Sequence, residues 1–396
     1  MKSDGAEQAD GADLAPGDID DAVGDLLDAL DAMDADGWYP AIDVVRPWSM
    51  HNPRITGEFA RPGAIRRYLH RELSALLRAG ARVGVRPARR AVAFNDPDFF
   101  AALDEDRFDL RAKKLFLFSP ERMALSLDRL SHYCGTPAEA FERHLLFTNY
   151  TMHIDAFRER FPGAEGPARD GVQMPAWHHH TPAGDGVSLV NIGVGPTNAK
   201  TVTDHLAVLR PDTMMMIGHC GGLRNHQRLG DFVVATAYQR ADHVLDGVLP
   251  ADVPVIPNHR LNTFLLDALD AAQAQYRLGV VHTTDNRNWE FNQGSALAAM
   301  RASRSTAVDM ESATIAGNGF RYRIPNATLL CVSDKPLHAS PKLSANASAF
   351  YETSKRQHLG IALSCLDRVR REHPDGLPSH DIRSVDEPLF EVDATE

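Results

Sequence analysis

From about residue 173 onward, short apolar runs rich in β-forming residues alternate with segments that have the length and apolar spacing of helices. The runs cover 187–194, 213–217, 231–235, 278–284, 307–309 and 328–333; the helical segments cover 197–209 and 292–302, and another begins at Ser312. Continuous apolar strands are typical of a sheet that helices bury on both faces. The alternation therefore predicts an α/β domain whose functional residues lie where strands end.

The N-terminal half is organised differently. Residues 1–17 are rich in Asp, Ala and Gly and have little to bury, so we expect a disordered acidic tail. Residues 37 to about 160 mix short extended pieces with helices near 64–78 and 120–132, which indicates α+β structure. Between these parts we expect a helix with Asp18 as its N-cap, because six apolar residues share one helical stripe: Ile19, Val23, Leu26, Leu27, Leu30 and Met33.

The domain boundaries follow from these changes of pattern. A length of 396 residues favours two domains. The Gly- and Pro-containing stretch 161–172 resembles a linker. We therefore expect, in chain order, a tail at 1–17, a smaller α+β domain at 18–160, a catalytic α/β domain at 173–374 and a polar tail at 375–396.

The negative charge is confined to one end of the chain. Residues 1–36 carry twelve carboxylates and one basic residue, Lys2, which accounts for the whole net charge of -11. The remaining chain balances 41 basic against 41 acidic residues, so it offers no basic surface for nucleic acid. No apolar run is long enough to span a bilayer, and the acidic amino terminus is unlike a secretory signal. We expect a cytoplasmic protein that binds neither membranes nor nucleic acids.

The residues that most often bind metals do not have metal-site spacing. The four cysteines, Cys134, Cys220, Cys331 and Cys365, are far apart and form no CxxC pair, so neither a zinc site nor a disulfide framework is indicated. The run 178–180 of three histidines has no spacing partner. We expect no metal and no cofactor.

Two glycine-rich turns are candidate ligand contacts. Gly195, in the GVGP stretch before a helix, could approach a phosphate or sugar, but the stretch is not GxGxxG and a simple tight turn explains it equally well. The second turn, GHCGG, follows an apolar strand, and its small residues leave room for a ligand. Its candidate binding residues are Gly218, His219, Cys220 and Gly221.

The stretch VDMES places a thioether and two carboxylates together after a predicted strand. A carboxylate such as Glu311 could hold the vicinal hydroxyls of a ribose, with Met310 against the apolar face of the sugar. Asp334, at another strand end, could protonate a departing purine at N7, since departure leaves an oxocarbenium-like sugar. Carboxylates at strand ends also serve as helix caps, so this interpretation has an alternative.

Longer motifs carry a family resemblance. VDMESATIAGNGFRYRIP, TLLCVSDKPLH, MIGHCGGLRNHQRLGDFV and TTDNRNWE resemble the AMP nucleosidases of the nucleoside phosphorylase superfamily, and the similarity covers nearly all of 173–370. Upstream, YCGTPAEAFERHLLFTNYT resembles the end of that family's amino-terminal domain. The resemblance implies a nucleoside-phosphorylase-like catalytic domain with a central mixed sheet. It also implies hydrolysis of AMP to adenine and ribose 5-phosphate by a homohexamer, with ATP and phosphate as effectors.

The resemblance assigns residue roles. Glu311 and Met310 would hold the ribose, Asp334 would protonate the base, Trp289 would line the base pocket, and 218–222 would approach the sugar. The shared Tyr150 is a further substrate-binding candidate. The substrate phosphate needs cations, for which the candidates are Lys335, Lys342, Arg54 and Arg61.

The sequence departs from the family pattern on the sugar-phosphate side, where the upstream domain is also abbreviated before Arg61. Met216 stands where phosphorylases carry a phosphate-binding arginine, which disfavours phosphorolysis. Met152 stands where a basic residue is expected, and the segment between Thr151 and Met174 is short. The alternatives are therefore an enzyme that joins adenine to a different, activated sugar phosphate, or a catalytically silent nucleotide-binding hexamer. Retention of both Glu311 and Asp334 argues against the silent protein.

Overall fold

The computed structural model describes residues 7–50, 53–103, 118–338 and 344–378, which fall into two compact units. The first contains the chain up to Arg129 together with Val208–Arg210, and the second contains Leu130–Ala207 and Pro211–Ser379. Each unit is described by itself.

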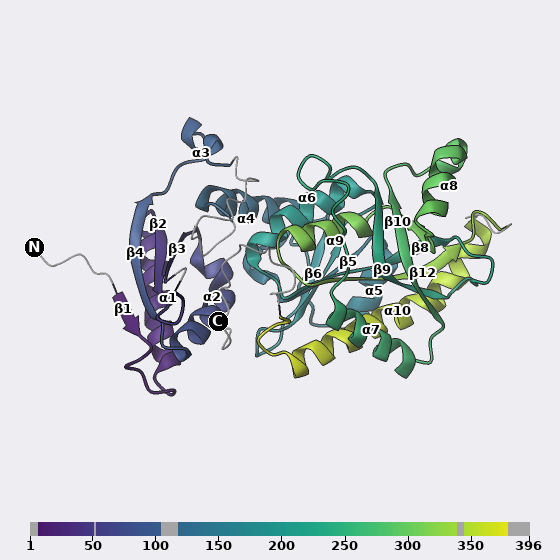
Figure 1. The fold of residues 1–396 in the computed structure, drawn as a ribbon. Coiled ribbons are helices and arrows are strands. Elements are labelled where there is room, and N and C mark those ends of the chain that lie inside the picture. Colours follow the sequence, from purple (N-terminus) through teal and green to yellow (C-terminus); the bar gives the residue numbers. More distant parts are fainter. Residues whose placement is uncertain (1–6, 51–52, 104–117, 339–343, 379–396) are drawn as a thin grey trace, which may run out of the picture. The chain divides into compact units, whose positions relative to one another are not determined.

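The first unit is an antiparallel sheet with two helices packed on it. Its strand order is β1-β4-β2-β3, with β1 at Glu7–Asp10, β4 at Arg82–Arg90, β2 at Trp38–Val45 and β3 at Arg54–Glu58. Helices α1 (Ile19–Ala35) and α2 (Arg66–Arg78, after the 3-10 turn η1 at Pro62–Ile65) pack against each other and against the sheet (Figure 1). Short helix α3 (Pro97–Ala101) and helix α4 (Pro120–Cys134) follow. The predicted α+β class is confirmed.

The predicted amphipathic helix is α1. Its buried residues are Ile19, Val23, Leu26, Leu27 and Leu30, whereas Met33 is only half-buried. Asp18 occupies the N-cap position but its side chain makes no capping hydrogen bond in the described structure. Packing of the apolar stripe on the sheet therefore stabilises this helix more than its N-cap residue does.

The prediction of disorder over 1–17 is wrong for β1, which pairs antiparallel with β4 from Glu7 opposite Val85 to Asp10 opposite Arg82. An edge strand gains its stability from backbone hydrogen bonds and a neighbouring strand, so it can form without apolar side chains of its own. The Arg82 guanidinium also lies 3.8 Å from the Asp10 carboxylate. Residues 1–6 lie outside the described residues, as does the predicted tail 375–396 from residue 379 onward.

The second unit is built on a mixed sheet of order β11-β10-β9-β12-β8-β5-β7-β6, in which β11 also pairs with β8. The extra pairing closes the strands from β8 through β12, β9 and β10 to β11 into a ring. The strands are β5 (His144–Thr148), β6 (Ala176–His179), β7 (Val187–Asn191), β8 (Thr213–Gly222), β9 (Phe232–Ala241), β10 (Tyr276–Thr284), β11 (Ala307–Asp309) and β12 (Asn326–Asp334). Pairs β6–β7, β9–β12 and β8–β11 are antiparallel and the others are parallel, as a mixed sheet requires.

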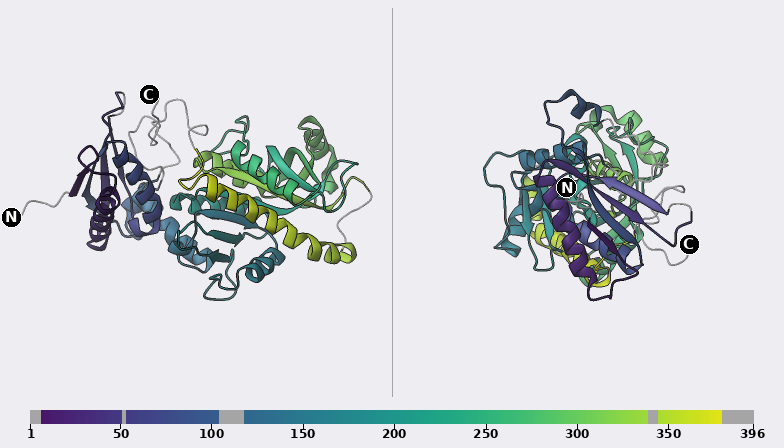
Figure 2. Two further views of the ribbon diagram at one scale, coloured as in Figure 1. Left: turned by 90° about the horizontal axis from the view of Figure 1, so that it is seen from below. Right: turned by 90° about the vertical axis from the view of Figure 1, so that its left-hand side faces the viewer.

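Helices cover both faces of this sheet (Figure 1). On one face, α10 (Ser344–Glu372) runs beside α5 (Thr151–Arg160) and α7 (His259–Ala271) (Figure 2). Their apolar sides form the main core with the strands, through residues such as Phe157, Leu265 and Leu366. On the other face, α6 (Pro196–Leu206) packs on α9 (Ser312–Arg321). The remaining elements are η2 (Ala138–Ala140), η3 (Ala207–Leu209), η4 (Trp289–Asn292) and α8 (Gln293–Ala302). Among the described helices, none is both long and apolar enough to cross a membrane.

The predicted binding loop at 218–222 is not a loop, because β8 continues to Gly222 and all of its residues are buried. Gly221 and Gly222 pair with Val308 and Ala307 of β11. A Cβ at Gly222 would lie 2.8 Å from Val332 Cγ1, so the glycine allows two strands to approach closely. Gly221 and Gly222 thus allow β11 to pair with β8 and close the ring of strands. A glycine-rich sequence alone does not distinguish this role from ligand binding.

The predicted domain boundary at 161–172 also differs from the structure. This stretch lies within the second unit, where Glu165 bridges to His178 of β6. The preceding strand β5 lies between β8 and β7 in the sheet, so it is integral to the second unit. Glycine and proline in 161–172 mark turns between α5 and β6, and the units divide near Arg129 instead.

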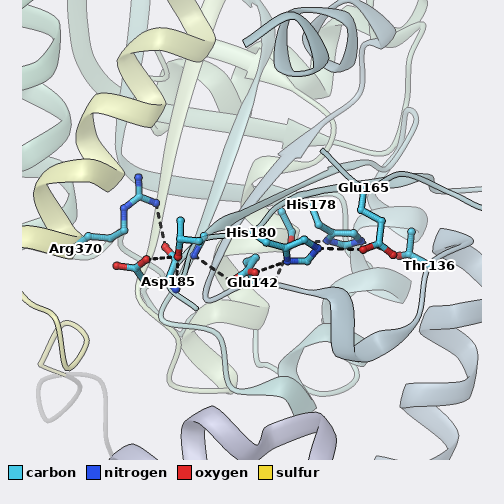
Figure 3. A network of polar contacts seen from close by, with 10 residues as sticks. Thr136, Glu142, Glu165, His178, His180, Asp185 and Arg370 are labelled. Carbon is cyan, nitrogen blue, oxygen red and sulfur yellow. Dashed lines mark hydrogen bonds and ion pairs between the residues drawn. The ribbon is translucent and has the colours of Figure 1, made fainter. Parts of the chain in front are cut away.

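The histidine run has a structural explanation at the β6 edge. His178 is buried, and contacts Ser188 Oγ at 2.8 Å and Thr136 Oγ1 at 2.9 Å; burial lowers its pKa to about 3. His180 lies between two carboxylates, 2.6 Å from Glu142 and 3.2 Å from Glu165 (Figure 3). The neutral His178 ring, through its hydrogen bonds, and the His180 ring, through its two carboxylate partners, therefore join β6 to the neighbouring segments.

Candidate active site

The Glu311 carboxylate lies where three chain segments meet. Glu311 follows β11 and is 1% exposed. The backbone N–H of Gly195, which precedes α6, donates to Glu311 Oε1 at 2.7 Å, and Asn149 Nδ2 donates to Glu311 Oε2 at 3.2 Å. Because Asn149 follows β5, the ends of two strands and the start of one helix fix both carboxylate oxygens.

The contact with Gly195 explains the glycine in the GVGP turn. Gly195 has φ of 119°, a backbone conformation that side-chain-bearing residues rarely adopt. In this conformation its N–H points to the carboxylate of Glu311. The glycine therefore belongs to the site by orienting Glu311, and direct contact with substrate stays a prediction.

Glu311 has a second carboxylate nearby, that of Asp309. Asp309 Oδ1 accepts from the Thr283 hydroxyl at 2.6 Å, and Oδ2 accepts from Ser312 N–H at 2.9 Å and from the Ser312 hydroxyl. Burial, and then the charge of Asp309, raises the pKa of Glu311 to about 8. The pKa of Asp309 is also raised by burial, but its donors favour its ionised form. Burial thus raises the pKa of both acids, and the charge of Asp309 adds to the rise at Glu311.

Asp334 ends β12, at the edge of β8 opposite β11. It lies in register with Gly221 of β8, and Gly221 in turn pairs with Val308 of β11. The Ser333 hydroxyl donates to Asp334 Oδ1 at 2.7 Å, and Asp334 is half-buried. Because β11 runs antiparallel to β8, the chain after Val308 returns toward Gly218. A Cβ at Gly218 would lie 3.5 Å from Asn149 Oδ1, and Asn149 bonds to Glu311. Glu311 therefore lies near Gly218 of β8, and Asp334 lies near Gly221 of the same strand.

His219 and Tyr150 belong to a stack of rings between the sheet and its helices. The His219 ring lies 4.6 Å from Tyr150 at its edge and 5.7 Å from His153, parallel to it; these distances join ring centroids. His358 of α10 completes the cluster at 5.9 Å from His219. Burial lowers the pKa of His358 to about 4 and holds that of His153 well below its usual value, so both stay neutral. Substrate contact by His219, Tyr150 and the buried Cys220 stays a prediction.

Trp289 packs in a small apolar cluster with Leu223, Met300 and Val308. Val308 is the second residue of β11, so the indole lies against the segment that carries Met310. Met310 itself is half-buried. This arrangement is compatible with an apolar wall for a base and sugar, the role that the sequence predicts for both residues.

The predicted phosphate-binding cations are divided between the two units of the chain. Lys335 directly follows Asp334, and its ammonium donates to the Asn225 carbonyl at 2.8 Å. Arg54, exposed on β3, and Arg61, 2.6 Å from Asp128, belong to the first unit. Lys342 lies outside the described residues. Their part in substrate binding stays a prediction.

Asn149 is the site residue that sequence reasoning missed. The available signal was a polar residue directly after the buried strand in LLFTNYT, the same position that drew attention to Asp334. Its Oδ1 is buried and has no hydrogen-bond partner among the described residues. A buried amide oxygen left without a donor is unusual in a folded protein and suggests that a ligand supplies the donor.

Replacing Asn149 with Leu, which is similar in size, should remove one hydrogen bond to Glu311 and the unpaired acceptor together. We expect kcat/KM for nucleotide cleavage to fall about 10- to 100-fold, since a bond to a charged group contributes about 1.5–3 kcal/mol. Steady-state kinetics beside thermal unfolding checks this. As a control, Asn198→Leu removes an amide that bonds the Ile192 carbonyl at 3.0 Å in the neighbouring turn. An equal loss in both variants would contradict a direct role for Asn149.

Comparison with known proteins agrees with the fold and the site. Residues 155–367 match the family model described as Phosphorylase superfamily. The crystal structure of purine nucleoside phosphorylase from Toxoplasma gondii, 18% identical, superposes with a TM-score of 0.51 over 59% of this chain and 94% of that chain, which shows the fold alone. The closed mixed sheet, with one carboxylate after β11 and another at the end of β12, is thus that of a phosphorylase-superfamily protein.

More specific relatives narrow this class. AMP nucleosidase of Escherichia coli strain K12 is 38% identical over an alignment of 431 positions that covers 89% of each chain. The crystal structure of AMP nucleosidase from Bacteroides thetaiotaomicron is 27% identical, with a TM-score of 0.53 over 63% of this chain and 99% of that chain. The chain belongs to the AMP nucleosidase family.

Proposed function

We propose that this protein hydrolyses the N-glycosidic bond of AMP to give adenine and ribose 5-phosphate. The observation that carries the proposal is the pair of carboxylates beside β8, with Glu311 held by Gly195 and Asn149 and with Asp334 at the end of β12. The 38% identity to an AMP nucleosidase over 89% of the chain supports the choice of AMP as substrate.

The two carboxylates divide the chemistry between them. Departure of adenine leaves positive charge on the sugar and negative charge on the base. Asp334 donates a proton to N7 of the purine, which makes the base a better leaving group. Glu311, in its ionised form, accepts hydrogen bonds from the ribose hydroxyls and opposes the positive charge. Met310 packs on the sugar, and Trp289 lines the side on which the base lies.

An apolar residue in β8 favours water over inorganic phosphate as the nucleophile that attacks the sugar. Met216 is fully buried in this strand, where a phosphorylase carries an arginine that binds free phosphate. A buried thioether cannot hold an anion. For the phosphate of the substrate, the candidates stay those that the sequence offers, Lys335, Lys342, Arg54 and Arg61.

The test is a chromatographic assay for free adenine after incubation of the pure protein with AMP. Inorganic phosphate and ATP are varied, and adenosine and other nucleoside monophosphates serve as controls. Adenine released from AMP without added phosphate is the expected result. Release that requires phosphate would indicate phosphorolysis. Binding of AMP with no release from any substrate would favour transfer of adenine to a different sugar phosphate, or a silent binding protein.

We further propose a homohexamer with ATP and phosphate as effectors, and a cytoplasmic location. The hexamer and the effectors follow from the family resemblance. For the location, the described structure adds that the four cysteines are buried free thiols, which suits a reducing compartment. Light scattering of the full chain measures the assembly. A monomeric mass at assay concentrations would contradict the hexamer.

A further inference from the structure

Helix α9 begins at Ser312, so Glu311 occupies its N-cap position. The first turn of a helix has backbone N–H groups without partners inside the helix, and a side chain at the N-cap usually accepts from one of them. The side chain of Glu311 makes no such bond in the described structure. Its oxygens instead accept from Gly195 and Asn149. Other groups must therefore satisfy the start of α9.

Those groups are Asp309 and Thr283. Asp309 Oδ2 accepts from Ser312 N–H at 2.9 Å, and Thr283 Oγ1 accepts from Ala313 N–H at 3.0 Å. The two side chains are joined, because the Thr283 hydroxyl donates to Asp309 Oδ1 at 2.6 Å. Thr283 of β10 and Asp309 of β11 are partners in register, so the sheet fixes both. Both are buried.

We propose that Asp309, with Thr283, is a substitute N-cap for α9, and that this substitution frees the carboxylate of Glu311 to face the substrate. Asp309 is thus a positioning residue that acts through Glu311. Where activity is its readout, the inference rests on the proposed function.

Capping of α9 by Asp309 in place of Glu311 has an electrostatic reason. With the first-turn donors open, the nearest carboxylate would be that of Glu311, and it would be drawn toward the positive end of α9. Asp309 occupies those donors and adds a negative charge behind Glu311. Both effects favour a Glu311 carboxylate turned toward Gly195 and Asn149. The cost is a pair of buried acids, which also raises the pKa of Glu311.

Other ionisable groups near this helix start bond to groups other than Glu311. Asp242, after β9, accepts from the Thr314 hydroxyl, and burial raises its pKa. Arg240 donates to the carbonyls of Leu249 and Pro250. The Tyr238 hydroxyl lies 2.9 Å from Thr328 Oγ1, and burial raises its pKa. Asp309 is therefore the charge that acts most directly on Glu311.

The experiment compares Asp309→Ala with Asp309→Asn. Asn keeps an oxygen for Ser312 N–H and removes the charge, whereas Ala removes the cap. We expect Asp309→Ala to lose about 10- to 100-fold in kcat/KM, as a displaced catalytic group does. Asp309→Asn should stay within about tenfold of the wild type, with the rise of kcat/KM displaced to lower pH because the neighbouring charge is gone.

A second readout does not depend on activity. Infrared difference spectra between pH 6 and pH 9 report the protonated carboxyl of Glu311, assigned by its absence in Glu311→Gln. The band should disappear at lower pH in Asp309→Asn than in the wild type. If the wild type releases no adenine from AMP, the proposed function fails while this measurement still tests the inference.

Thr283 supplies a matched pair in case Asp309→Ala does not fold. Thr283→Ser keeps the hydroxyl and should behave as the wild type, whereas Thr283→Val removes it and should reduce kcat/KM in the direction of Asp309→Ala. Two outcomes would overturn the proposal. One is equal loss in Asp309→Ala and Asp309→Asn without displacement of the pH profile or the infrared band. The other is Thr283→Val with wild-type kinetics.

Discussion

Replacing Asp334 with Asn is expected to slow adenine release from AMP by about 10²- to 10⁴-fold while AMP affinity changes less than about threefold. Asparagine has nearly the same shape as aspartic acid and can still contact N7, but it has no proton to give. Its amide oxygen can accept from the Ser333 hydroxyl, which donates to Asp334 Oδ1 at 2.7 Å. The substitution therefore removes the chemistry and keeps the surroundings.

The measurement is single-turnover release of adenine at saturating enzyme, with AMP affinity determined separately by calorimetry. Ser333→Ala is the matched control, since it removes the hydroxyl beside Asp334 and leaves the proton donor. We expect that control to lose less than about tenfold, the value of one neutral hydrogen bond. A parallel fall of affinity and rate in Asp334→Asn would show that Asp334 binds the substrate and does not act as its acid.

The strand-end carboxylates could be predicted because their cause is local. In an α/β sheet the strands are nearly continuous apolar runs, so a charged residue directly after such a run lies at an end of the sheet. This argument predicted Glu311 and Asp334, and in the structure Glu311 follows β11 and Asp334 is the last residue of β12. The same argument applies to Asn149 after β5, which was overlooked because an amide is a weaker chemical signal than a carboxylate.

What could not be predicted depends on contacts between distant segments. Gly221 and Gly222 resemble a ligand loop in the sequence, yet they lie in β8 because β11 pairs with its end. The glycine-rich stretch 161–172 resembles a linker, yet Glu165 within it bridges to β6. Likewise, the choice of Asp309 over Glu311 as the cap of α9 requires the neighbour Thr283, which lies 26 residues earlier in the chain. The composition of a segment indicates its local structure but does not identify the segment that it contacts in the fold.

Replacing Glu311 with Gln is expected to reduce kcat/KM for AMP by at least about 10³-fold, because the variant lacks the charge that opposes the positive sugar. The same change should stabilise the protein. Gln fits the site, since its amide oxygen can accept from Gly195 N–H. Asn149 can turn its amide so that Oδ1, which has no partner among the described residues, accepts from the new amide.

The stability gain should depend on pH in a defined direction. Glu311 has a folded pKa of about 8, above its ordinary value of 4.5, so between these values the folded state holds a proton that the unfolded state lacks. The free energy of unfolding of the wild type therefore falls as pH rises through this window, by a total on the order of 2–5 kcal/mol. Gln does not titrate and escapes this loss.

Thermal unfolding of both proteins at pH 5 and pH 9 measures this difference. The Tm of Glu311→Gln should exceed that of the wild type by several degrees more at pH 9 than at pH 5. An advantage that is the same at both pH values would mean that Glu311 is already ionised in the folded enzyme at pH 5. A buried carboxylate kept for a sugar should make the site less stable than its amide variant does, because the hydroxyls of the substrate add donors to the two that Gly195 and Asn149 supply.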